Sequence, residues 1–469
     1  MAWKVYRRVR AVRIVVAVVA LVAVTAAIAM GCGSWLLRMQ IVPALLACSG
    51  IWLAVWVAVT ALVGRIYCST VCPLGTLQDI FAALTRRLRP QGYFYRPARP
   101  ALRWCMVVAL VGAAVFGQSV VVGLLDPYSD YARIVNYLLM PAVRPVTFTL
   151  AGLLVAFLTL AVTAFFSIRG GRTLCNTVCP VGTLLGALSR YSLYHVDIDT
   201  DKCVGCGLCT ARCKAHCIDP GAHTVDLSRC VVCFDCLSDC PNSAITFRRG
   251  RHRLKMPMLQ TVEGAQSACS KTPGKAAGAV TPISRRTFLA AMAATGAALP
   301  AAALPGDTRP LNAAIPPGNE GAEAFHARCT ACGSCVSVCP TGVIRPSLGE
   351  LGWRNLMQPV LDFNIAACRY DCTKCSEACP TGALLPLTVA AKHRFVIGKA
   401  RLVTEDCLLY TTGRGTGKCA AVCPRQAIVI ETLEDGHRLP RVDFDECIGC
   451  GECRRVCPAR PRAWVIEGV

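Results

Sequence analysis

Cysteines recur along this chain in short runs of regular spacing, a pattern that indicates metal binding. The stretch CVGCGLCTARC begins at residue 203 and CVVCFDCLSDCP at residue 230. Each run has the C-x2-C-x2-C-x3-C spacing in which three thiolates hold one [4Fe–4S] cube and the fourth ligates the other cube. A zinc site does not require two such quartets. The spacing predicts one cluster on Cys203, Cys206, Cys209 and Cys240, and a second on Cys230, Cys233, Cys236 and Cys213.

One cysteine near these runs belongs to neither predicted ligand set. Cys217 lies four residues after Cys213, and Lys214 stands where a proline usually follows the fourth cysteine of a run. We therefore expect Cys217 to be a structural residue.

Four further runs lie beyond residue 320, and three of them are complete. The third is defective, because Thr416 stands where the spacing of its neighbours would place a cysteine. We expect its cluster to be [3Fe–4S], to take a non-cysteine ligand, or to be absent. The β-like segments RLVTEDC and RVDFDEC lead into the third and fourth runs, as in ferredoxin-like hairpins. The distal candidate ligands are Cys329, Cys332, Cys335, Cys339, Cys368, Cys372, Cys375, Cys379, Cys407, Cys419, Cys423, Cys447, Cys450, Cys453 and Cys457.

The composition agrees with a metal protein. The chain has 469 residues, 32 cysteines and a formal net charge of +22 that counts every cysteine as neutral. Disulfide scaffolds are small and secreted, whereas this chain is long and its cysteines lie in tight runs. Thiolates bound to iron would lower the net charge. Because the basic residues gather beside apolar segments, we expect a membrane partner and no nucleic acid.

Four apolar stretches are long enough to cross a bilayer, which takes about 20 residues of helix. The N-terminus and the loop 65–103 are rich in Arg, whereas the intervening loops hold few basic residues. The positive-inside rule therefore places the N-terminus, and the CSTVCP and CNTVCP segments at 68–73 and 175–180, in the cytoplasm. A soluble helical core is the alternative, which the scarcity of charges disfavours. No histidine lies in these stretches and no CxxCH occurs, so we expect no haem. The predicted spans are residues 14–30, 41–63, 104–125 and 146–168.

A second cysteine motif, C-x3-C-P, occurs twice, in CSTVCPLGTLQD (68–79) and CNTVCPVGTLLG (175–186). Each copy follows an apolar stretch, so the two would face each other if the preceding helices form related halves. Four converging thiolates are a ligand set for a cluster, whereas two separate pairs are two dithiol switches. A third interpretation is that each Cys-Pro merely caps a helix. We expect a metal or cluster site on Cys68, Cys72, Cys175 and Cys179.

Between the two groups of ferredoxin-like runs lies a linker with an export signature. Arg285 and Arg286 precede an Ala-rich, mildly apolar run, which is typical of a twin-arginine signal. That route carries folded cargo, as a cluster-bearing domain requires. An Ala/Pro linker that keeps the whole chain cytoplasmic is the alternative. The predicted domains are 1–190 (four membrane helices), 191–250 (cytoplasmic two-cluster ferredoxin), 251–320 (linker, with the signal at 283–305 as a fifth crossing) and 321–469 (exported ferredoxin).

These motifs resemble two known families. The duplicated C-x3-C-P on a four-helix unit, followed by two ferredoxin runs, resembles NapH, the membrane component of the quinol dehydrogenase that serves periplasmic nitrate reductase. The twin-arginine segment with four runs is similar to the NapG and MauM periplasmic ferredoxins. The chain looks like a fusion, NapH-like over about 1–255 and NapG-like over about 283–469. The superfamily includes NosR- and CcoG-like proteins. Resemblance to four-run ferredoxins implies that the outer runs share ligands, as do the inner ones.

The resemblance implies a membrane α-helical bundle joined to α+β ferredoxin-like domains in the bacterial inner membrane. It also implies quinol oxidation, with electrons passing through two cytoplasmic and three to four distal clusters to a periplasmic cytochrome or reductase. Quinol oxidation releases protons, so a carboxylate of raised pKa is expected nearby. The outer loop DPYSDYARIVNY supplies candidates, although Asp-Pro-Tyr-Ser is also an ordinary turn. The candidate quinol residues are Asp126, Tyr128, Asp130 and Arg133, with Tyr131 beside them.

Two other functional classes fit the same motifs. An assembly factor for a periplasmic or membrane metalloenzyme would use the C-x3-C-P thiols to bind or reduce metal. A conduit fed by a cytosolic reductant would need no quinone, and it explains the clusters on the cytoplasmic side. The response of reduced clusters to a quinone analogue distinguishes these classes from quinol dehydrogenation.

Overall fold

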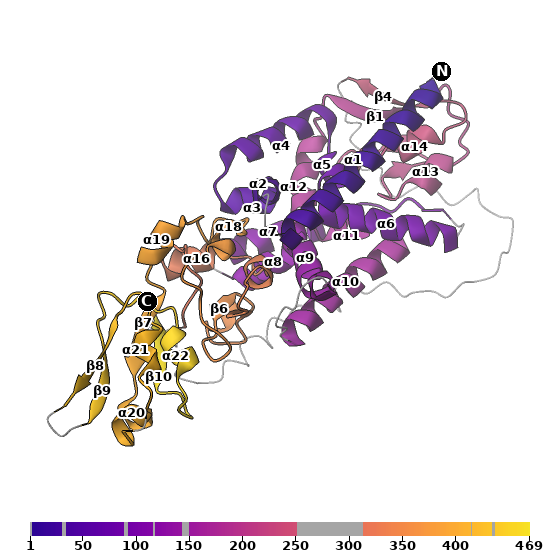
Figure 1. The fold of residues 1–469 in the computed structure, drawn as a ribbon. Helices are drawn as coiled ribbons and strands as arrows, with labels where there is room; N and C mark the ends of the chain where they lie inside the picture. Colours follow the sequence, from indigo (N-terminus) through magenta and orange to yellow (C-terminus); the bar gives the residue numbers. More distant parts are fainter. Residues whose placement is uncertain are drawn as a thin grey trace. The chain divides into compact units, whose positions relative to one another are not determined.

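The computed structural model describes most of the chain on both sides of a long central segment (Figure 1). The predicted export signal at 283–305 and most of the linker around it lie outside the described residues. The described residues are 2–30, 34–88, 92–115, 118–142, 150–250, 313–413, 415–433 and 437–469.

Two helices in the described part of the chain are long and apolar enough to cross a membrane. α1 (Ala2–Met30) has 29 residues and α10 (Leu150–Gly170) has 21. A 21-residue helix is about 32 Å long, which matches a hydrocarbon core of about 30 Å. They correspond to the predicted spans 14–30 and 146–168.

The other two predicted spans, 41–63 and 104–125, are divided into shorter helices. The first breaks where Cys48 takes a φ of 51°, because a left-handed residue cannot continue a right-handed helix. The longest piece of 41–63 has 14 residues and is about 21 Å long, which is less than the hydrocarbon core. Among the described residues, neither of these two predicted spans is therefore a single helix long enough to cross the membrane. The pieces are α3 (Ile41–Leu46), α4 (Gly50–Val63), α7 (Pro100–Val115) and α8 (Ser119–Leu125).

Both copies of the C-x3-C-P motif fold in the same way. A short helix carries the first cysteine, the chain breaks at the second, and the following proline opens a longer helix. Proline suits the first helical position because no N–H is needed there. The elements are α5 (Tyr67–Thr70) and α6 (Pro73–Leu88) in the first copy, and α11 (Thr173–Thr177) and α12 (Pro180–Ser189) in the second.

The remaining helices of this half complete the packing around the two motifs. α1 contacts α5 and α6, α10 contacts α6 and α9, and α12 contacts α4 and α7 (Figure 1). The additional elements are α2 (Ser34–Arg38), α9 (Pro127–Ile134), the π-helix η1 (Val135–Leu139) and the 3-10 turn η2 (Met140–Ala142).

Residues 191–250 form a small α+β unit that shares one hydrophobic core with these helices. Its outer strands pair antiparallel, with Val196 opposite Phe247, and a two-residue ladder lies inside them. α14 packs against α1, so this unit is continuous with the helical half. The elements are β1 (Tyr194–Ile198), α13 (Leu208–Arg212), β2 (Ile218–Asp219), β3 (Thr224–Val225), α14 (Asp235–Ser238) and β4 (Ile245–Arg249).

The distal part is also α+β, with three antiparallel strand pairs among its described residues. β5 pairs with β6, β8 with β9, and the distant β7 and β10 pair with Ala400 opposite Ile466. β7 and β9 precede the third and fourth cysteine runs, where the sequence predicted strands. The strands are β5 (Ile344–Pro346), β6 (Pro359–Leu361), β7 (Gly398–Leu402), β8 (Ile428–Thr432), β9 (Arg438–Val442) and β10 (Trp464–Gly468).

The helices of the distal part are one to two turns long, and most follow a cysteine or carry one. They hold the runs in place and contribute little core of their own. They are α16 (Ala322–Arg328), α17 (Ser334–Ser337), η3 (Trp353–Asn355), α18 (Lys374–Glu377), α19 (Val389–Arg394), η4 (Thr404–Asp406), α20 (Leu408–Thr411), α21 (Lys418–Ala421) and α22 (Glu452–Val456).

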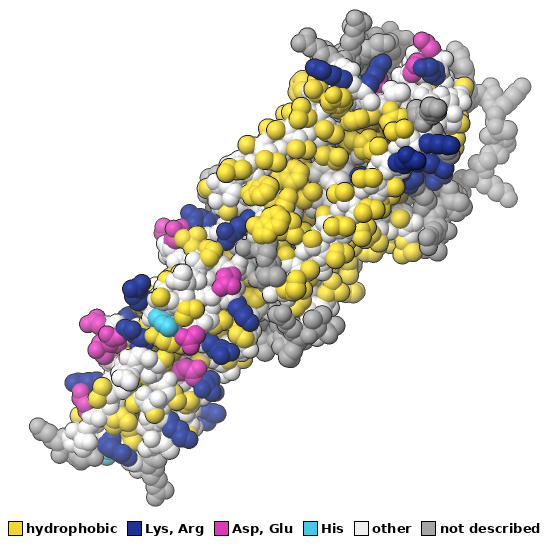
Figure 2. All heavy atoms as spheres, turned by 45° about the horizontal axis from the view of Figure 1, so that its top comes forward, with side chains coloured by type: hydrophobic (Ala, Val, Ile, Leu, Met, Phe, Trp, Pro, Cys, Tyr) yellow, Lys and Arg dark blue, Asp and Glu magenta, His cyan; other side chains and the backbone are white. Residues whose placement is uncertain are grey.

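Large hydrophobic side chains are exposed along the helices of the N-terminal half. Val15, Val19, Ile51, Phe157 and Leu158 are at least 60% exposed. Figure 2 shows such side chains gathered over one face, with few charged side chains between them. Contiguous exposed apolar surface of this kind indicates contact with a membrane or a partner.

Candidate iron–sulfur centres and the adjoining cavity

The structure brings the four cysteines of the two C-x3-C-P motifs together. Cys72 lies within electrostatic range of Cys68, Cys175 and Cys179. Three of these thiols are buried, and the Cys179 thiol is half-buried. The arrangement offers four sulfur ligands in a dry setting, which is what a [4Fe–4S] cube requires.

Two buried arginines flank this thiol group in a symmetric manner. Arg65 and Arg172 each stand three residues before the first cysteine of a motif, and both side chains are fully buried. The Nη2 atom of Arg65 lies 3.9 Å from the Cys68 sulfur, and its Nη1 atom donates to Asn176 Oδ1 at 3.0 Å. Arg172 donates to the backbone carbonyl of Cys68, in the other copy. Two cations beside four thiolates offset the negative charge that a bound cluster would bring.

Sequence reasoning missed these arginines. Arg65 was counted only among the basic residues that set the membrane orientation. The pattern R-x-x-C-x3-C-P, present in both copies, indicated that the two arginines belong to the thiol site. An arginine at the end of an apolar stretch is ordinary in a membrane protein. The repeated spacing, and not the residue type, distinguishes it.

The glycine of each C-P-x-G sequence permits close approach of the chain. A Cβ atom on Gly75 would collide with the carbonyl oxygen of Cys68, and one on Gly182 with that of Cys175. The added atom at Gly182 would also lie 2.7 Å from Arg65 Nη2. These glycines let the longer helix of each motif turn back over its own cysteine.

Gly182→Ala is therefore expected to disturb the thiol group and lower the iron content of the purified protein. Overpacking of this kind costs about 1–3 kcal/mol. Gly112→Ala in α7 is the matched control, because nothing lies within 4 Å of its added carbon. Equal iron content and thermal stability in the two variants would show that Gly182 has no such role.

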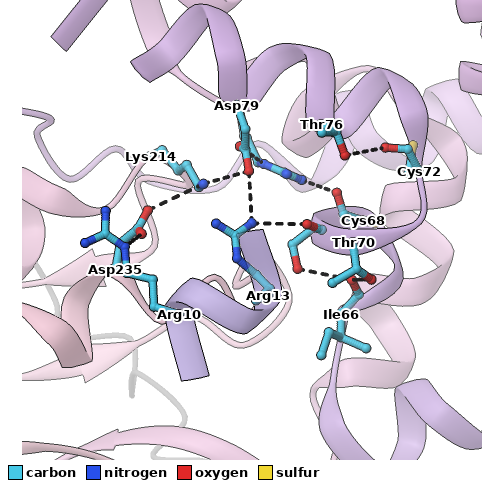
Figure 3. Close-up of polar contacts among 12 residues, drawn as sticks. Arg10, Arg13, Ile66, Cys68, Thr70, Cys72, Thr76, Asp79, Lys214 and Asp235 are labelled. Atoms are coloured by element: carbon cyan, nitrogen blue, oxygen red, sulfur yellow. Dashed lines mark hydrogen bonds and ion pairs between the residues drawn. The ribbon is translucent and has the colours of Figure 1, made fainter. Parts of the chain in front are cut away.

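A buried charge network connects the first C-x3-C-P motif to the ferredoxin-like unit at 191–250 (Figure 3). Asp79 on α6 accepts hydrogen bonds from Arg13 Nη1 at 3.2 Å, Arg172 Nε at 2.7 Å and Lys214 Nζ at 2.7 Å. Lys214 Nζ also lies 3.4 Å from Asp235. Lys214 follows Cys213 and Asp235 lies one residue before Cys236, so the network reaches the second predicted cluster directly.

Burial alone would raise the pKa of Asp79, but Arg172 and Lys214 outweigh it and hold that pKa well below its usual range. The carboxylate therefore stabilises the fold above the unfolded pKa of about 3.9, and this contribution is lost only as pH falls toward the lowered value. Asp79→Asn leaves buried cations short of a partner, and breaking such a pair costs about 3–5 kcal/mol. We expect a large fall in thermal stability at pH 7.

The control for Asp79→Asn is Asp199→Asn, which removes an exposed carboxylate paired with Lys202 at 2.8 Å. Solvent screens that pair, so its loss should change stability little. Comparable melting temperatures for the two variants would contradict the assigned role of the Asp79 network.

Within the 191–250 unit, the structure brings together all four thiols of the second predicted ligand set and three thiols of the first. Cys236 lies in electrostatic range of Cys233, Cys213 and Cys230, which is the second predicted set. Cys209 lies near Cys203 and Cys206, and Cys240 packs separately against the same hydrophobic core. An unexpected thiol, Cys217, lies 3.4 Å from Cys213.

The distal runs associate as neighbours, which corrects the expectation that outer runs share ligands with outer and inner with inner. Cys335 lies near Cys329, Cys332 and Cys379, so three thiols of the first run meet the fourth thiol of the second. The reciprocal set is Cys339 with Cys368, Cys372 and Cys375. The physical reason is local: the β5–β6 hairpin joins the first run to the second, and the β8–β9 hairpin joins the third to the fourth.

The third and fourth runs likewise line two small cavities. Cys423 shares one cavity with Cys447, Cys450 and Cys453. The other cavity is lined by three thiols and by Thr416, the residue that stands where the run spacing would place a cysteine. Gly415, the residue before Thr416, also lines this cavity. Three thiols suit a [3Fe–4S] cluster, or a [4Fe–4S] cluster with one non-cysteine ligand. The lining thiols of this cavity are Cys407, Cys419 and Cys457.

Backbone contacts link these sets to one another and to the helical half. The Cys368 N–H donates to the carbonyl of Cys450 at 2.9 Å, which joins the two halves of the distal part. Asn136 Nδ2 in η1 donates to the carbonyl of Cys332 at 3.0 Å. The first distal set therefore lies directly against the segment that follows α9.

The four candidate quinol residues fall into different environments. Asp126 caps α9: it accepts from the N–H groups of Tyr128 and Ser129 at 3.1 Å each and from the Ser129 hydroxyl at 2.6 Å. Tyr128 is 1% exposed. These two residues do not line the cavity described next, which weakens the first interpretation of Asp126 as an open proton acceptor. Asp130 lines that cavity. Arg133 Nη2 donates a hydrogen bond to the Asp130 carboxylate oxygen Oδ1 at 2.8 Å.

A cavity of about 230 Å³ has in its wall both Cys179, predicted at the cytoplasmic face, and Asp130, predicted in the outer loop. Its wall is mainly apolar, with the carboxylate of Asp130 and the Cys179 thiol among the few polar groups. Burial raises the pKa of Asp130 to about 7, in spite of the Arg133 guanidinium, which lowers it. The other lining residues are Leu74, Leu124, Leu125, Pro127, Leu158, Thr159, Val162, Thr163, Leu174 and Val178.

Comparison with known families agrees with this chemistry. A family described as a 4Fe–4S binding domain matches residues 48–90 and 149–195, which contain both C-x3-C-P motifs. Two families described as 4Fe–4S dicluster domains match residues 328–384 and 414–460. The first match contains the first and second distal runs, and the second match contains the fourth run and the part of the third run after Cys407. The protein is a ferredoxin-type electron-transfer protein that binds [4Fe–4S] clusters.

Curated relatives narrow the class to a family. The chain is 32% identical over 163 residues to the methylamine utilization ferredoxin-type protein MauM of Methylophilus methylotrophus, covering 32% of this chain and 70% of the relative. It is 36% identical over 171 residues to MauM of Paracoccus denitrificans, covering 34% and 72%. The ferredoxin-type protein NapG of Escherichia coli is 29% identical over 150 residues, covering 30% and 64%. The chain belongs to the NapG/MauM-type family of ferredoxins.

The matched segments are short compared with this chain and shorter than the relatives themselves. They cover about a third of it and about two thirds of each relative's length. No solved structure matches the chain.

Proposed function

We propose that the protein is a membrane-bound fusion of a NapH-like unit and a NapG/MauM-type ferredoxin that oxidises quinol and delivers electrons to a periplasmic reductase. The observation that carries the proposal is the cavity between Asp130 and Cys179. It places a proton-accepting group and a candidate cluster ligand around one mainly apolar space. Ligand sites are commonly apolar cavities with a few convergent polar groups.

Quinol oxidation must remove two protons and two electrons. Asp130 is the proton acceptor, because its carboxylate faces the cavity and its pKa of about 7 matches the ambient pH. Arg133 fixes the orientation of that carboxylate through the 2.8 Å contact. Bound clusters supply one-electron acceptors. The apolar walls exclude water and admit the ring of a quinol whose tail remains in lipid.

The ligand sets follow from the thiol groups described above. Cys68, Cys72, Cys175 and Cys179 would hold a cluster beside the cavity, and the first distal set would receive electrons at the η1 contact of Asn136 with Cys332. Tyr128 lies near Cys332 and Asp126, so it occupies the space between the loop and this distal set. From there the Cys368–Cys450 contact continues the path outward.

A second candidate function is a conduit fed from the cytosol. The observation that favours it is the Asp79–Lys214 contact of 2.7 Å, which joins the first C-x3-C-P motif to the loop after Cys213. That contact gives the cytoplasmic clusters a structural route to the membrane thiols. The assembly-factor interpretation has no comparable contact in its favour among the described residues.

The test uses anaerobically purified full-length protein with its clusters chemically reduced. Mixing with a menaquinone or ubiquinone analogue should reoxidise the clusters, as followed by the decay of their EPR signals. Clusters that ignore quinone but exchange electrons with a low-potential ferredoxin would replace the proposal with the conduit. Clusters that respond to neither would favour the assembly factor.

A further inference from the structure

Five thiols, and not four, converge at the second cluster position of the cytoplasmic unit. Cys213, Cys230, Cys233 and Cys236 form the set expected from the run spacing. Cys217 lies among them: its sulfur is 3.4 Å from that of Cys213, and the Cys230 thiol is a close neighbour. A ligand set for a [4Fe–4S] cube needs one cysteine for each iron, so one thiol is in excess.

The position of Cys217 is fixed by its surroundings. Its carbonyl accepts from the Asp226 N–H at 2.8 Å, and its side chain is 2% exposed. The preceding residue, His216, is held by the carbonyl oxygens of Phe94 at 2.6 Å and Gly170 at 2.9 Å. Contacts from three other segments therefore fix Cys217 beside Cys213. Its thiol faces the other cysteines and does not simply fill apolar space in the core.

The short distance between the two sulfurs limits what they can do together. The Cys217 sulfur lies 3.4 Å from that of Cys213, so it is close enough to reach the iron that Cys213 would ligate. A cube offers that iron one cysteine position, so only one of the two thiols can occupy it at a time. The residue after Cys213 is lysine instead of the usual proline, and Lys214 is drawn toward Asp79 and Asp235.

We propose that Cys213 and Cys217 are interchangeable ligands of one iron of the cluster held by Cys230, Cys233 and Cys236. In the exchange one iron–sulfur bond breaks as the other forms, and the proton of the incoming thiol passes to the departing thiolate. No oxidant or reductant is needed. A second ligand keeps the cluster whole when one thiol is oxidised. The inference rests on the proposed ligand set and is independent of quinol oxidation.

The experiment measures iron and acid-labile sulfide, with Mössbauer spectra, on the full-length protein purified anaerobically. The variants are Cys213→Ala, Cys217→Ala and the double replacement. Cys236→Ala is the control for loss of a unique ligand, and Cys105→Ala is the control for an exposed thiol outside every run. Alanine is used because a serine oxygen can itself bind iron.

Each single replacement should keep the full iron content, and the double replacement should lose as much iron as Cys236→Ala, up to about four atoms per chain. Loss of that iron in Cys213→Ala alone, with Cys217→Ala unaffected, would overturn the proposal and leave Cys217 a structural residue. Loss in Cys217→Ala alone would overturn it as well, because Cys217 would then be the sole ligand. EPR signals of the distal clusters report whether each variant is folded.

Discussion

Replacement of Cys179 by alanine is expected to remove up to about four irons per chain and to abolish quinol-dependent reduction of the distal clusters. The four C-x3-C-P thiols lie together beside two buried arginines, so loss of one ligand leaves an incomplete set in a dry, positively charged site. Iron and sulfide analysis measures the first effect, and EPR after addition of a quinol analogue measures the second. Cys105→Ala, on α7, is the matched control.

The same variant distinguishes a cluster from a pair of dithiol switches. If each motif works as a dithiol, Cys179→Ala would leave the iron content equal to that of Cys105→Ala. That outcome would contradict a cluster at this site. The cavity at Asp130 would then have no electron acceptor beside it.

Replacement of Asp130 by asparagine is expected to slow quinol oxidation by about 100-fold or more at pH 8, because a positioned general base contributes about 10²–10⁴-fold. In the unmodified protein the carboxylate form accepts the proton, and its pKa is about 7 because burial raises it. The rate should therefore rise as pH increases through 7 and level off above it. In Asp130→Asn this pH dependence should disappear. The measurement is the initial rate of quinol-analogue oxidation between pH 5.5 and 8.5, values chosen to span about 1.5 units on either side of that pKa.

The control for this variant is Asp201→Asn, which removes an exposed carboxylate in the unit at 191–250. Its rate and pH profile should equal those of the unmodified protein. A profile that keeps its midpoint near pH 7 in Asp130→Asn would assign the titrating group elsewhere.

The ligand spacings were readable from sequence because cluster geometry dictates them. The spacing of CVGCGLCTARC and CVVCFDCLSDCP predicts that Cys213 joins the first three cysteines of the second run, and these four thiols lie close together in the structure. The duplicated C-x3-C-P also predicted two facing pairs, since equivalent helical elements deliver equivalent side chains. Thr416 stands beside three thiols, where the run spacing placed the missing cysteine.

Other features depended on contacts that spacing does not encode. The pairing of the distal runs follows from the β5–β6 and β8–β9 hairpins, each of which brings two consecutive runs together. The resemblance to four-run ferredoxins had instead implied that the two outer runs share ligands, as do the two inner ones. The helix break at Cys48 comes from the backbone conformation of one residue inside an apolar stretch. A hydropathy profile does not detect such a break, because the residues on both sides are apolar. Asp126 and Asp130 look alike in sequence, but the first caps a helix and only the second faces the cavity.

The most direct test of quinol oxidation uses the full-length protein in liposomes that contain a quinol analogue, with a membrane-impermeant electron acceptor outside. We expect quinol-dependent reduction of the acceptor, lost in both Asp130→Asn and Cys179→Ala and retained in Cys105→Ala. Acceptor reduction no faster than in protein-free liposomes, with all clusters present by EPR, would contradict quinol oxidation by this protein.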